Sequence, residues 1–503
     1  MTFSFIRNIL AALLIVCPLG AGAYTPKREM RALWVATVWG IDWPKSAGTS
    51  VTAVRRQHED LSWIISMARE LNFTTVCFQV RGMADTMYPS ELEPWSSFLT
   101  GERGRDPGWD PLQYAVDECH AAGLECYAWV NPFRWSSGTD YNTPRDKELK
   151  RRGWLLRHGK YTVLNPGLEE VRAHVTAVCR EIVENYDVDG LVFDDYFYPN
   201  KIPEDATAGD FKIYTRQAPW MKFGDWRRAN IHKAVADVSA MVSEVRPGCR
   251  FGISPAGVAG KTETSAAKWG TDACGVKASD WQWKDIYSDP LGWLYQGTVD
   301  FISPQLYWAT DHPTAPFGPL AEWWAQTAAT YGTHCYSSVT LERVRKGDFS
   351  RNVRDLGRQI SINRSVSPDH QSGIWIYSAK WVPEVADELR RAFARPSLTP
   401  VLQGAETPRP PRDVRRRRGS VEWREAETDA DRTVRYTVYA VPKSVDESAM
   451  IDPEDGGISA DWLLGVTYEP YWPLDGSKSV KGMRYAVCTL SGEGAESQPV
   501  WAD

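Results

Sequence analysis

The chain has 503 residues and a formal net charge of −6 at pH 7, from 58 Lys and Arg against 64 Asp and Glu. This length exceeds one ordinary domain and is enough for a barrel with a smaller module. Because the balance is acidic and no Lys- or Arg-rich face stands out, nucleic acid is not an expected partner. The 24 Trp and 21 Tyr residues are unusually many. Most belong in a core, and the excess suits stacking on the apolar faces of sugar rings.

Residues 1–23 have the pattern of a signal peptide. A charged residue precedes Ile9–Leu19, an apolar run too short to span a bilayer, and Ala21-Gly22-Ala23 provides a small-x-small cleavage pattern. We therefore expect an exported protein, periplasmic, cell-surface or secreted, whose mature chain begins at Tyr24. Lipid attachment at Cys17 is the less favoured alternative, since the residue before it is not small. No other run approaches transmembrane length.

Residues 24–395 alternate between strand-like and helix-like patterns, which is typical of repeated βα units around a parallel sheet. Eight such units predict an α/β fold of the (β/α)₈ TIM-barrel type. The strands are expected at about 32–37, 75–80, 125–130, 190–193, 250–254, 300–303, 334–339 and 373–377. The helices are expected at about 52–71, 110–122, 169–186, 226–245, 291–296, 320–331, 353–363 and 383–394. Long polar loops at 136–150 and 259–285 should extend the face that carries the site.

The pattern changes after the predicted barrel. Residues 396–418 contain many prolines and a run of four arginines, which predicts a stiff, charged linker. Residues 419–503 then alternate like antiparallel strands and weakly resemble a fibronectin type III module. We expect a small all-β sandwich there, one that serves binding or spacing rather than chemistry.

Cysteine and histidine positions give no sign of a metal centre. Eight cysteines remain after the predicted cleavage, scattered through strand-like and helix-like runs without a CxxC spacing. They look like buried small side chains rather than a disulfide framework. The eight histidines are dispersed, no Gly-rich phosphate loop follows a strand, and no GxSxG elbow is present. No metal and no cofactor is therefore expected.

The fourth predicted strand ends in two acids. The apolar run Leu191–Phe193 leads directly into Asp194, Asp195 and Tyr196. Acids at the C-terminal end of a barrel strand lie where such barrels place their chemistry, although a helix-capping role is the structural alternative. Successive strand side chains point to opposite faces, so both acids reach one site only if the strand ends between them. We expect Asp194 to be the ionised nucleophile or stabiliser and Asp195 the acid/base.

Other strand ends provide polar and aromatic groups that would converge on the same rim. Each also has a structural alternative, such as Asp42 capping a turn or Arg81 pairing with Asp85. The candidate substrate-binding residues are Asp42, Arg81, Asp85, Asn131, Arg134, Asn165, Tyr196, Gln305, Tyr307 and Trp308. Among these, Arg81 and Arg134 could meet a carboxylate on a ligand, and a structural salt bridge is the equal alternative for both.

Residues 28 to about 395 resemble the glycosyl-hydrolase-like-ten family of envelope proteins. The matching segments are 28–38, 42–44, 78–81, 88–90, 92–95, 131–132, 164–167, 188–199, 225–228, 251–255 and 304–308. The resemblance implies a TIM-barrel glycoside hydrolase that acts on glycans, with cell-wall peptidoglycan the favoured substrate class. Two departures bear on sugar specificity: Gly82-Met83 stands in the second-strand loop for an expected Pro-Ala, and Ala256-Gly257-Val258 for a bulkier Phe-Gly-Ile.

The mechanism is less defined than the class. Glycoside hydrolysis usually uses two carboxyl groups, one of them protonated. If Asp195 does not reach the mouth, Asp85 or Asp42 would be the acid. Chitinase barrels end their fourth strand in an acidic Glu, and Tyr196 occupies that position here. The usual substrate-assisted mechanism is therefore not expected, although a 2-acetamido sugar could participate through Asp194.

Three functions remain open from the sequence. The first is an exported O-glycosyl hydrolase of the cell envelope, with a poly- or oligosaccharide substrate. The second is a non-catalytic carbohydrate-binding protein that has kept the barrel. The third is a scaffold whose C-terminal sandwich docks an envelope protein.

Overall fold

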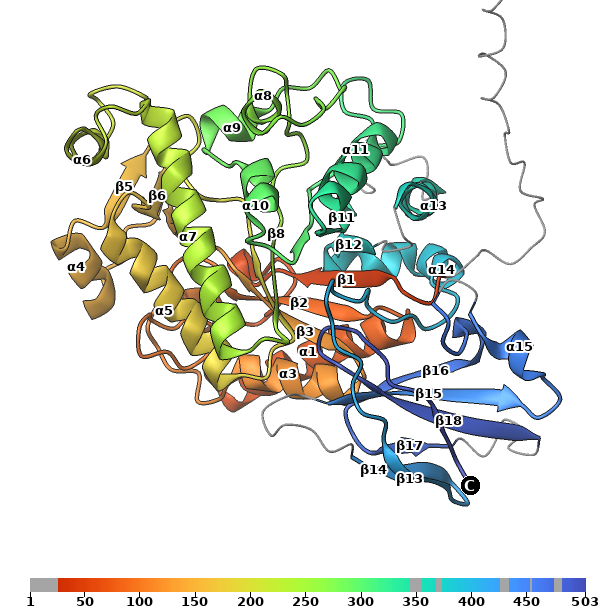
Figure 1. Ribbon diagram of the computed structural model, residues 1–503. Helices are drawn as coiled ribbons and strands as arrows, with labels where there is room; N and C mark the ends of the chain where they lie inside the picture. The colour runs from red at the N-terminus through yellow and green to blue at the C-terminus, as the bar shows by residue number, and fades with distance from the viewer. Residues whose placement is uncertain (1–25, 343–353, 368–372, 426–433, 453–454, 475–481) are drawn as a thin grey trace, which may run out of the picture.

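A computed structural model describes residues 26–342, 354–367, 373–425, 434–452, 455–474 and 482–503 (Figure 1). The predicted signal peptide, Cys17 and the predicted mature start at Tyr24 therefore lie outside the described residues. The barrel strands are β1 (Met30–Val35), β2 (Thr75–Arg81), β3 (Glu125–Val130), β7 (Gly190–Phe193), β8 (Arg250–Ile253), β9 (Phe301–Ile302), β10 (His334–Cys335), β11 (Ser337–Thr340) and β12 (Gly373–Tyr377).

These nine strands form one parallel sheet in the order β10-β9-β8-β7-β3-β2-β1-β12-β11. Its two edge strands, β10 and β11, are consecutive in the chain and are separated only by Tyr336. The segment 334–340 therefore joins both edges of the sheet and completes an eight-stranded barrel. Gln305 extends this closure, since it bridges to Ala256 on one side and to Ser338 on the other. The predicted TIM barrel is confirmed.

The helices form the outer layer of the barrel (Figure 1). Those of the βα units are α1 (Val51–Glu70), α3 (Pro111–Ala121), α5 (Glu169–Asn185), α7 (Phe223–Val245), α10 (Pro290–Gln296), α11 (Phe317–Thr330), α13 (Arg354–Val366) and α14 (Val382–Ala392). Shorter ones are η1 (Val38–Gly40), α2 (Ser97–Thr100), α4 (Pro144–Arg151), α6 (Phe211–Gln217), α8 (Ser265–Trp269), α9 (Trp281–Asp285) and η3 (Ala379–Trp381). Local sequence sets their starts: the Ser50 side chain caps α1, and Asp110 caps α3 immediately before a proline.

Large aromatic side chains fill the barrel interior. Trp34, Trp129 and Trp375 belong to one buried cluster, with ring centroids 4.8 Å apart for Trp34 and Trp129. Such rings need space from neighbouring strands. A Cβ on Gly190 would lie 2.6 Å from the Tyr127 ring, and one on Gly252 would lie 2.4 Å from a Phe301 ring atom. The many aromatic residues of the sequence are thus partly explained by a core built of rings packed over glycines.

The segment after β3 is more ordered than the sequence predicts. Residues 136–150 were expected to form a loop, but β4 (Arg134–Ser137), β5 (Leu155–His158) and β6 (Tyr161–Leu164) form an antiparallel sheet in the order β4-β6-β5. Helix α4 lies between β4 and β5, and its N-terminus is a capping box made by Thr143 and Asp146. This small sheet begins at Arg134 and so fixes a residue of the barrel mouth.

The C-terminal region is a second, all-β unit. Its strands are β13 (Arg412–Arg416), β14 (Ser420–Arg424), β15 (Arg435–Pro442), β16 (Leu463–Thr467), β17 (Tyr471–Pro473), β18 (Met483–Leu490) and β19 (Val500–Trp501), with α15 (Glu447–Met450) and η4 (Ala460–Trp462) between them. They form two antiparallel sheets, β13-β14-β17 and β16-β15-β18-β19. A buried cluster that includes Val421, Trp423, Val438 and Val487 joins the sheets, which gives the expected sandwich. Strand β13 lies within 396–418, so part of the expected linker is strand. The fibronectin type III resemblance stays a prediction.

The sandwich packs against the N-terminal ends of the barrel strands. Glu125, the first residue of β3, forms a buried ion pair with Arg435 of β15. Asp189, directly before β7, accepts a hydrogen bond of 3.0 Å from the Tyr468 hydroxyl. The sandwich therefore covers the end of the barrel opposite to the predicted site. Among the described residues, no helix is both long and apolar enough to cross a lipid bilayer.

Cysteines of the described regions carry free thiols. Seven of the eight after residue 25 are buried, and Cys335 is half-buried. Cys77 and Cys126 lie in barrel strands, and Cys119 lies on the buried face of α3. They act as small core side chains, as the sequence indicates.

Candidate active site

The two acids after β7 lie at the barrel mouth. The Asp194 amide still bonds to the Val130 carbonyl at 3.2 Å, which continues the pairing with β3. The chain then turns, since the Phe197 amide donates to the Asp195 carbonyl at 3.1 Å. The strand therefore ends between the two acids, which is the condition under which both side chains can reach one site. Asp194 is 8% exposed and Asp195 is 6% exposed.

Asp194 and Asp195 form a coupled pair. The Asp195 amide donates to Asp194 Oδ1 at 2.8 Å. Burial raises the pKa of Asp194, and the hydrogen bonds from Asp195 and Gln305 and the charge of Arg134 offset only part of this. Burial, then the Asp194 charge, raise the pKa of Asp195 well above its usual value. Two adjacent buried carboxyls cannot both ionise cheaply, and the larger rise in pKa at Asp195 makes it the member of the pair that favours the protonated form.

Gln305 and Tyr307 approach the acid pair from the sixth barrel strand. The Gln305 amide nitrogen donates to the Ser254 carbonyl at 3.0 Å and lies 3.4 Å from Asp194 Oδ1. Gly257 permits this position, because a Cβ there would lie 2.3 Å from the Gln305 carbonyl oxygen. Burial raises the pKa of the Tyr307 hydroxyl, and the charges of Tyr377, Asp194 and Asp195 add to this increase. Trp308 is half-buried next to Gly257, 2.7 Å from its virtual Cβ.

Arg134 forms the opposite side of the mouth. Its guanidinium lies 3.6 Å from the centre of the Tyr196 ring and 5.7 Å from that of Trp39. Both rings are open to solvent, Trp39 at 56% and Tyr196 at 44% exposure. Aromatic faces that stand exposed beside a buried cation and two carboxyls suit a ligand with apolar ring faces and polar substituents.

Tyr377 and Glu342 are site residues that sequence analysis missed. Tyr377 ends β12 and stacks on Tyr307 at 6.1 Å between ring centroids. Burial, then the charges of Asp42 and Asp194, raise the pKa of Tyr377, and Glu342 adds to this. Glu342 follows β11 by two residues. Their positions in the sequence could have identified them, since each residue lies at or just after the C-terminal end of a predicted strand.

Three predicted binding residues are engaged in structural contacts instead. Asp42 accepts hydrogen bonds from the Ala36 amide at 2.7 Å, the Ser378 hydroxyl at 2.8 Å and the Lys380 amide at 3.0 Å. It therefore joins the loops after β1 and β12. Arg81 and Asp85, the other two, do not pair with each other.

Arg81 forms a bidentate ion pair with Glu93, at 2.6 and 2.7 Å, and donates to the backbone carbonyl of Pro132 at 3.0 Å. Asp85 is bound by Arg103 at 3.1 Å. Both Arg81 and Asp85 are almost fully buried. Their charges are compensated inside the protein, so neither is placed to meet a substrate or to act as the acid.

The two predicted asparagines lie below the surface. Asn131 is fully buried after β3 and accepts a hydrogen bond of 3.2 Å from the Gln79 amide. Asn165 accepts one of 3.0 Å from the Gly167 amide, directly before α5. Gly167 permits the tight turn, because a Cβ there would lie 2.5 Å from the Trp226 ring. Asn131 supports the floor of the mouth, whereas Asn165 shapes a loop.

The described residues contain no group of three or more His, Cys, Asp or Glu arranged to hold a metal ion. The chemical groups at the mouth are therefore an acid pair, an arginine, an amide and open aromatic rings. A parallel barrel with an acid pair of raised pKa at the C-terminal ends of its strands has the architecture and the site position of a TIM-barrel enzyme.

Comparison with known proteins gives the family. The model of the family described as "Glycosyl hydrolase-like 10" matches residues 29–352, and the chain belongs to this family. Glycosyl hydrolase YngK of Bacillus subtilis is 32% identical over 71% of this chain and 70% of its own length. Glycosyl hydrolase DigH of Escherichia coli is 32% identical over 67% of this chain and 81% of its own length.

Similarity to solved structures is weaker. The PgaB (BpsB) glycoside hydrolase domain of Bordetella bronchiseptica has 12% identity and a TM-score of 0.47, over 72% of this chain and 98% of that domain. A likeness of this size carries no argument about substrate or mechanism. Family membership, with relatives named as glycosyl hydrolases, supports a glycosidase.

Proposed function

We propose that this chain is an exported glycoside hydrolase that cleaves a cell-envelope or environmental glycan, with peptidoglycan strands favoured, through Asp194 and Asp195. The observation that carries the proposal is the acid pair itself. Two carboxyls with raised pKa values lie at the barrel mouth with no full counter-charge, whereas Asp85 and Asp189 are bound by cations. Such destabilised acids are typical of catalytic sites.

The pair can perform acid catalysis with one proton. Protonated Asp195 donates to the glycosidic oxygen as the bond from this oxygen to the anomeric carbon breaks. Ionised Asp194 stabilises the positive charge that develops on the sugar. A water oxygen then bonds to the anomeric carbon and its proton returns to Asp195. The carboxyls are in hydrogen-bond contact, closer than the ~5 Å used for a separate nucleophile and acid. A neighbouring 2-acetamido group on the sugar would suit this arrangement.

The mouth also suits an acidic glycan. Trp39 and Tyr196 offer open ring faces for sugars, and Arg134 lies between them as a buried cation. A carboxylate on the glycan, such as the lactyl group of muramic acid, would meet this guanidinium. A signal peptide at 1–23 would deliver the enzyme to such a substrate outside the cytoplasm. The sandwich, with its fibronectin type III-like pattern, would then be a spacer or a docking unit for an envelope protein.

The test compares the full chain with an Asp194→Asn variant on purified peptidoglycan and on chitin oligosaccharides. The parent should release reducing ends from one of them. The variant should lose about 10³-fold in rate, since it cannot stabilise the developing charge, yet should sediment with the insoluble glycan as before. Its melting temperature should not fall, because the substitution removes a buried charge.

Two results would contradict the proposal. A variant that cleaves as fast as the parent removes Asp194 from the mechanism. A parent that binds the glycan without releasing reducing ends favours the non-catalytic carbohydrate-binding function.

A further inference from the structure

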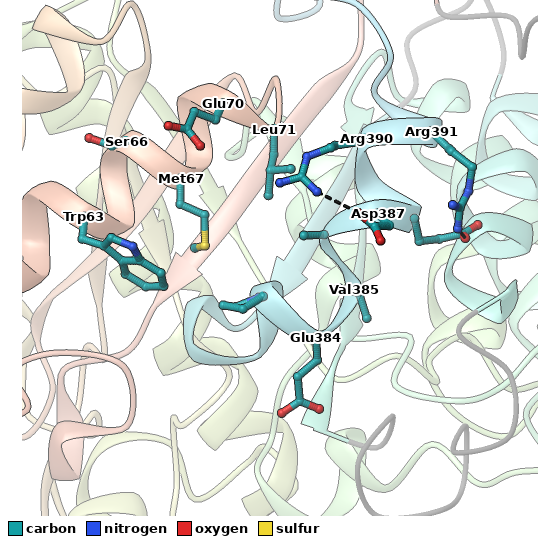
Figure 2. Close-up of a pocket in the computed structure, with 13 residues that line it drawn as sticks. Trp63, Ser66, Met67, Glu70, Leu71, Glu384, Val385, Asp387, Arg390 and Arg391 are labelled. Carbon is teal, nitrogen blue, oxygen red and sulfur yellow. Dashed lines mark hydrogen bonds and ion pairs between the residues drawn. The ribbon is translucent and has the colours of Figure 1, made fainter.

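A groove on the barrel wall lies far from the acid pair. It runs between α1 and α14, which cover the neighbouring strands β1 and β12, and has a volume of about 550 Å³. Trp63 and Met67 of α1 and Leu71, directly after the helix, form one side (Figure 2). Val385 and Arg390 of α14 form the other side. None of the residues that line it belongs to the barrel mouth.

Trp63 is not needed for packing of the barrel. Leu61, Ile64, Ile65 and Ala68 form the buried stripe of α1, with the spacing of an amphipathic helix. Trp63 lies outside that stripe and is 54% exposed. A single exposed ring is ordinary at a protein surface, so what distinguishes Trp63 is its position on the wall of a groove that a ligand can enter.

Ionised side chains surround the indole. Glu70 lies on α1, and Glu384 lies at the start of α14 (Figure 2). Arg390 and Asp387 form an exposed ion pair at 2.7 Å, which contributes little stability by itself. The rim thus presents hydrogen-bond donors and acceptors side by side, around one apolar ring face. A sugar ring is complementary to such a surface, because its hydroxyl groups surround an apolar face of C–H bonds.

We propose that this groove is a second, non-catalytic glycan-binding site, in which Trp63 stacks on a sugar ring while the charged rim bonds its hydroxyl groups. This proposal rests on the proposed function, because it takes the enzyme's polymeric substrate as the ligand. Trp63 lies ~18 Å along α1 from the residue that begins the helix near the mouth. A long glycan strand that leaves the mouth can run along α1 to Trp63, whereas a short oligosaccharide held at the mouth does not reach it. The site should therefore matter for polymer and not for small substrates.

The experiment measures binding of the full chain to purified peptidoglycan sacculi by co-sedimentation, in the Asp194→Asn background so that the glycan is not consumed. Trp63→Ala should weaken binding about fivefold, the size expected for one aromatic stacking contact. Trp63→Phe should keep most of the affinity. Tyr295→Ala is the matched control, since Tyr295 is an equally open ring, 61% exposed, on helix α10 of the same barrel wall. In the otherwise parental chain, Trp63→Ala should leave hydrolysis of short soluble oligosaccharides unchanged.

Three outcomes would overturn the site. The first is that Trp63→Ala binds the sacculi as tightly as the chain without this substitution. The second is that Tyr295→Ala weakens binding as much as Trp63→Ala does. The third is a concentration-dependent dimer in sedimentation velocity that Trp63→Ala abolishes, which would make the groove a contact between copies. Failure of the proposed function looks different, because the parent itself would then cleave no glycan, long or short.

Discussion

Strand β7 has an acid at each end, and the two acids differ in the number and strength of their hydrogen-bond partners. Before the strand, Asp189 accepts hydrogen bonds from His120 at 2.9 Å, the Cys126 amide at 2.8 Å and the Tyr468 hydroxyl at 3.0 Å. After the strand, Asp194 receives one amide bond of 2.8 Å and a long contact of 3.4 Å from Gln305.

The electrostatic consequences differ in sign. Burial acts to raise the pKa of Asp189, but His120 and Arg435 outweigh it, so the pKa is lowered. At the other end burial wins, and the pKa values of Asp194 and Asp195 are raised. At this strand, the acid on the sandwich side is neutralised by its partners and the acids on the mouth side are left destabilised. Similar burial with different partners separates a structural acid from a catalytic one.

The largest effect should come from Asp195→Asn, which removes the acidic proton. Loss of a general acid typically lowers the rate ~10²–10⁴-fold. In the parent, activity should fall at high pH as Asp195 loses its proton, since its pKa is raised. The variant should lose this alkaline limb from its pH–rate profile, and glycosides with good leaving groups should be less affected. Initial rates across pH on natural and activated substrates measure both.

Asp42→Asn is the control for that variant. Asp42 also follows a barrel strand, β1, but it accepts hydrogen bonds from two backbone amides and a hydroxyl, so its substitution should leave the alkaline limb in place. If Asp195→Asn retains the parental alkaline limb, then a group other than Asp195 supplies the proton.

The sandwich end of the barrel should respond in stability rather than activity. Arg435→Met leaves Glu125 buried without its cation, which typically costs about 3–5 kcal/mol. The rate on soluble substrate below the unfolding transition should not change, because the pair lies opposite to the mouth. Urea unfolding and a rate assay on the same sample test both statements. Arg391→Met is the matched control, since the Arg391 guanidinium is exposed and pairs with Glu388 at the surface, so its loss should barely change the midpoint of unfolding. Equal stabilities of the two variants would contradict the contrast.

Most of the fold could be predicted from the sequence, because periodicity and punctuation are local signals. The strands expected at 125–130, 190–193 and 373–377 match the observed bounds. The sheet β4-β6-β5 was missed for the same reason. Its strands are four residues each, too short to show a period, and β4 pairs with β6 across helix α4, a contact distant in sequence.

The site was partly predictable. Asp194, Asp195, Arg134, Gln305 and Tyr307 gather at the mouth because parallel strands deliver their C-terminal ends to one rim. Arg81 and Asp85 follow a strand in the same way, yet their charges are used internally. Their partners, Glu93 and Arg103, lie in the loop after β2 and could not be assigned without coordinates. The position of a residue in the sequence thus places it at the rim of the barrel. Whether it can meet a substrate depends on the side chains that pair with it.

The smallest effect should be a pH-dependent loss of stability in His120→Gln. Burial acts to lower the pKa of His120, but Asp189 outweighs it, so the pKa is raised above 6.5. This contribution is fully present below pH 6.5 and is lost as pH rises through the raised pKa. The Asp189 contribution is present above pH 3.8 and is lost as pH falls through the lowered pKa. The parent should therefore exceed His120→Gln by ~1–2 kcal/mol near pH 5–6, and the difference should shrink at alkaline pH. Urea unfolding of both chains across pH measures it, and a constant difference would show that His120 acts by packing on Tyr468 alone.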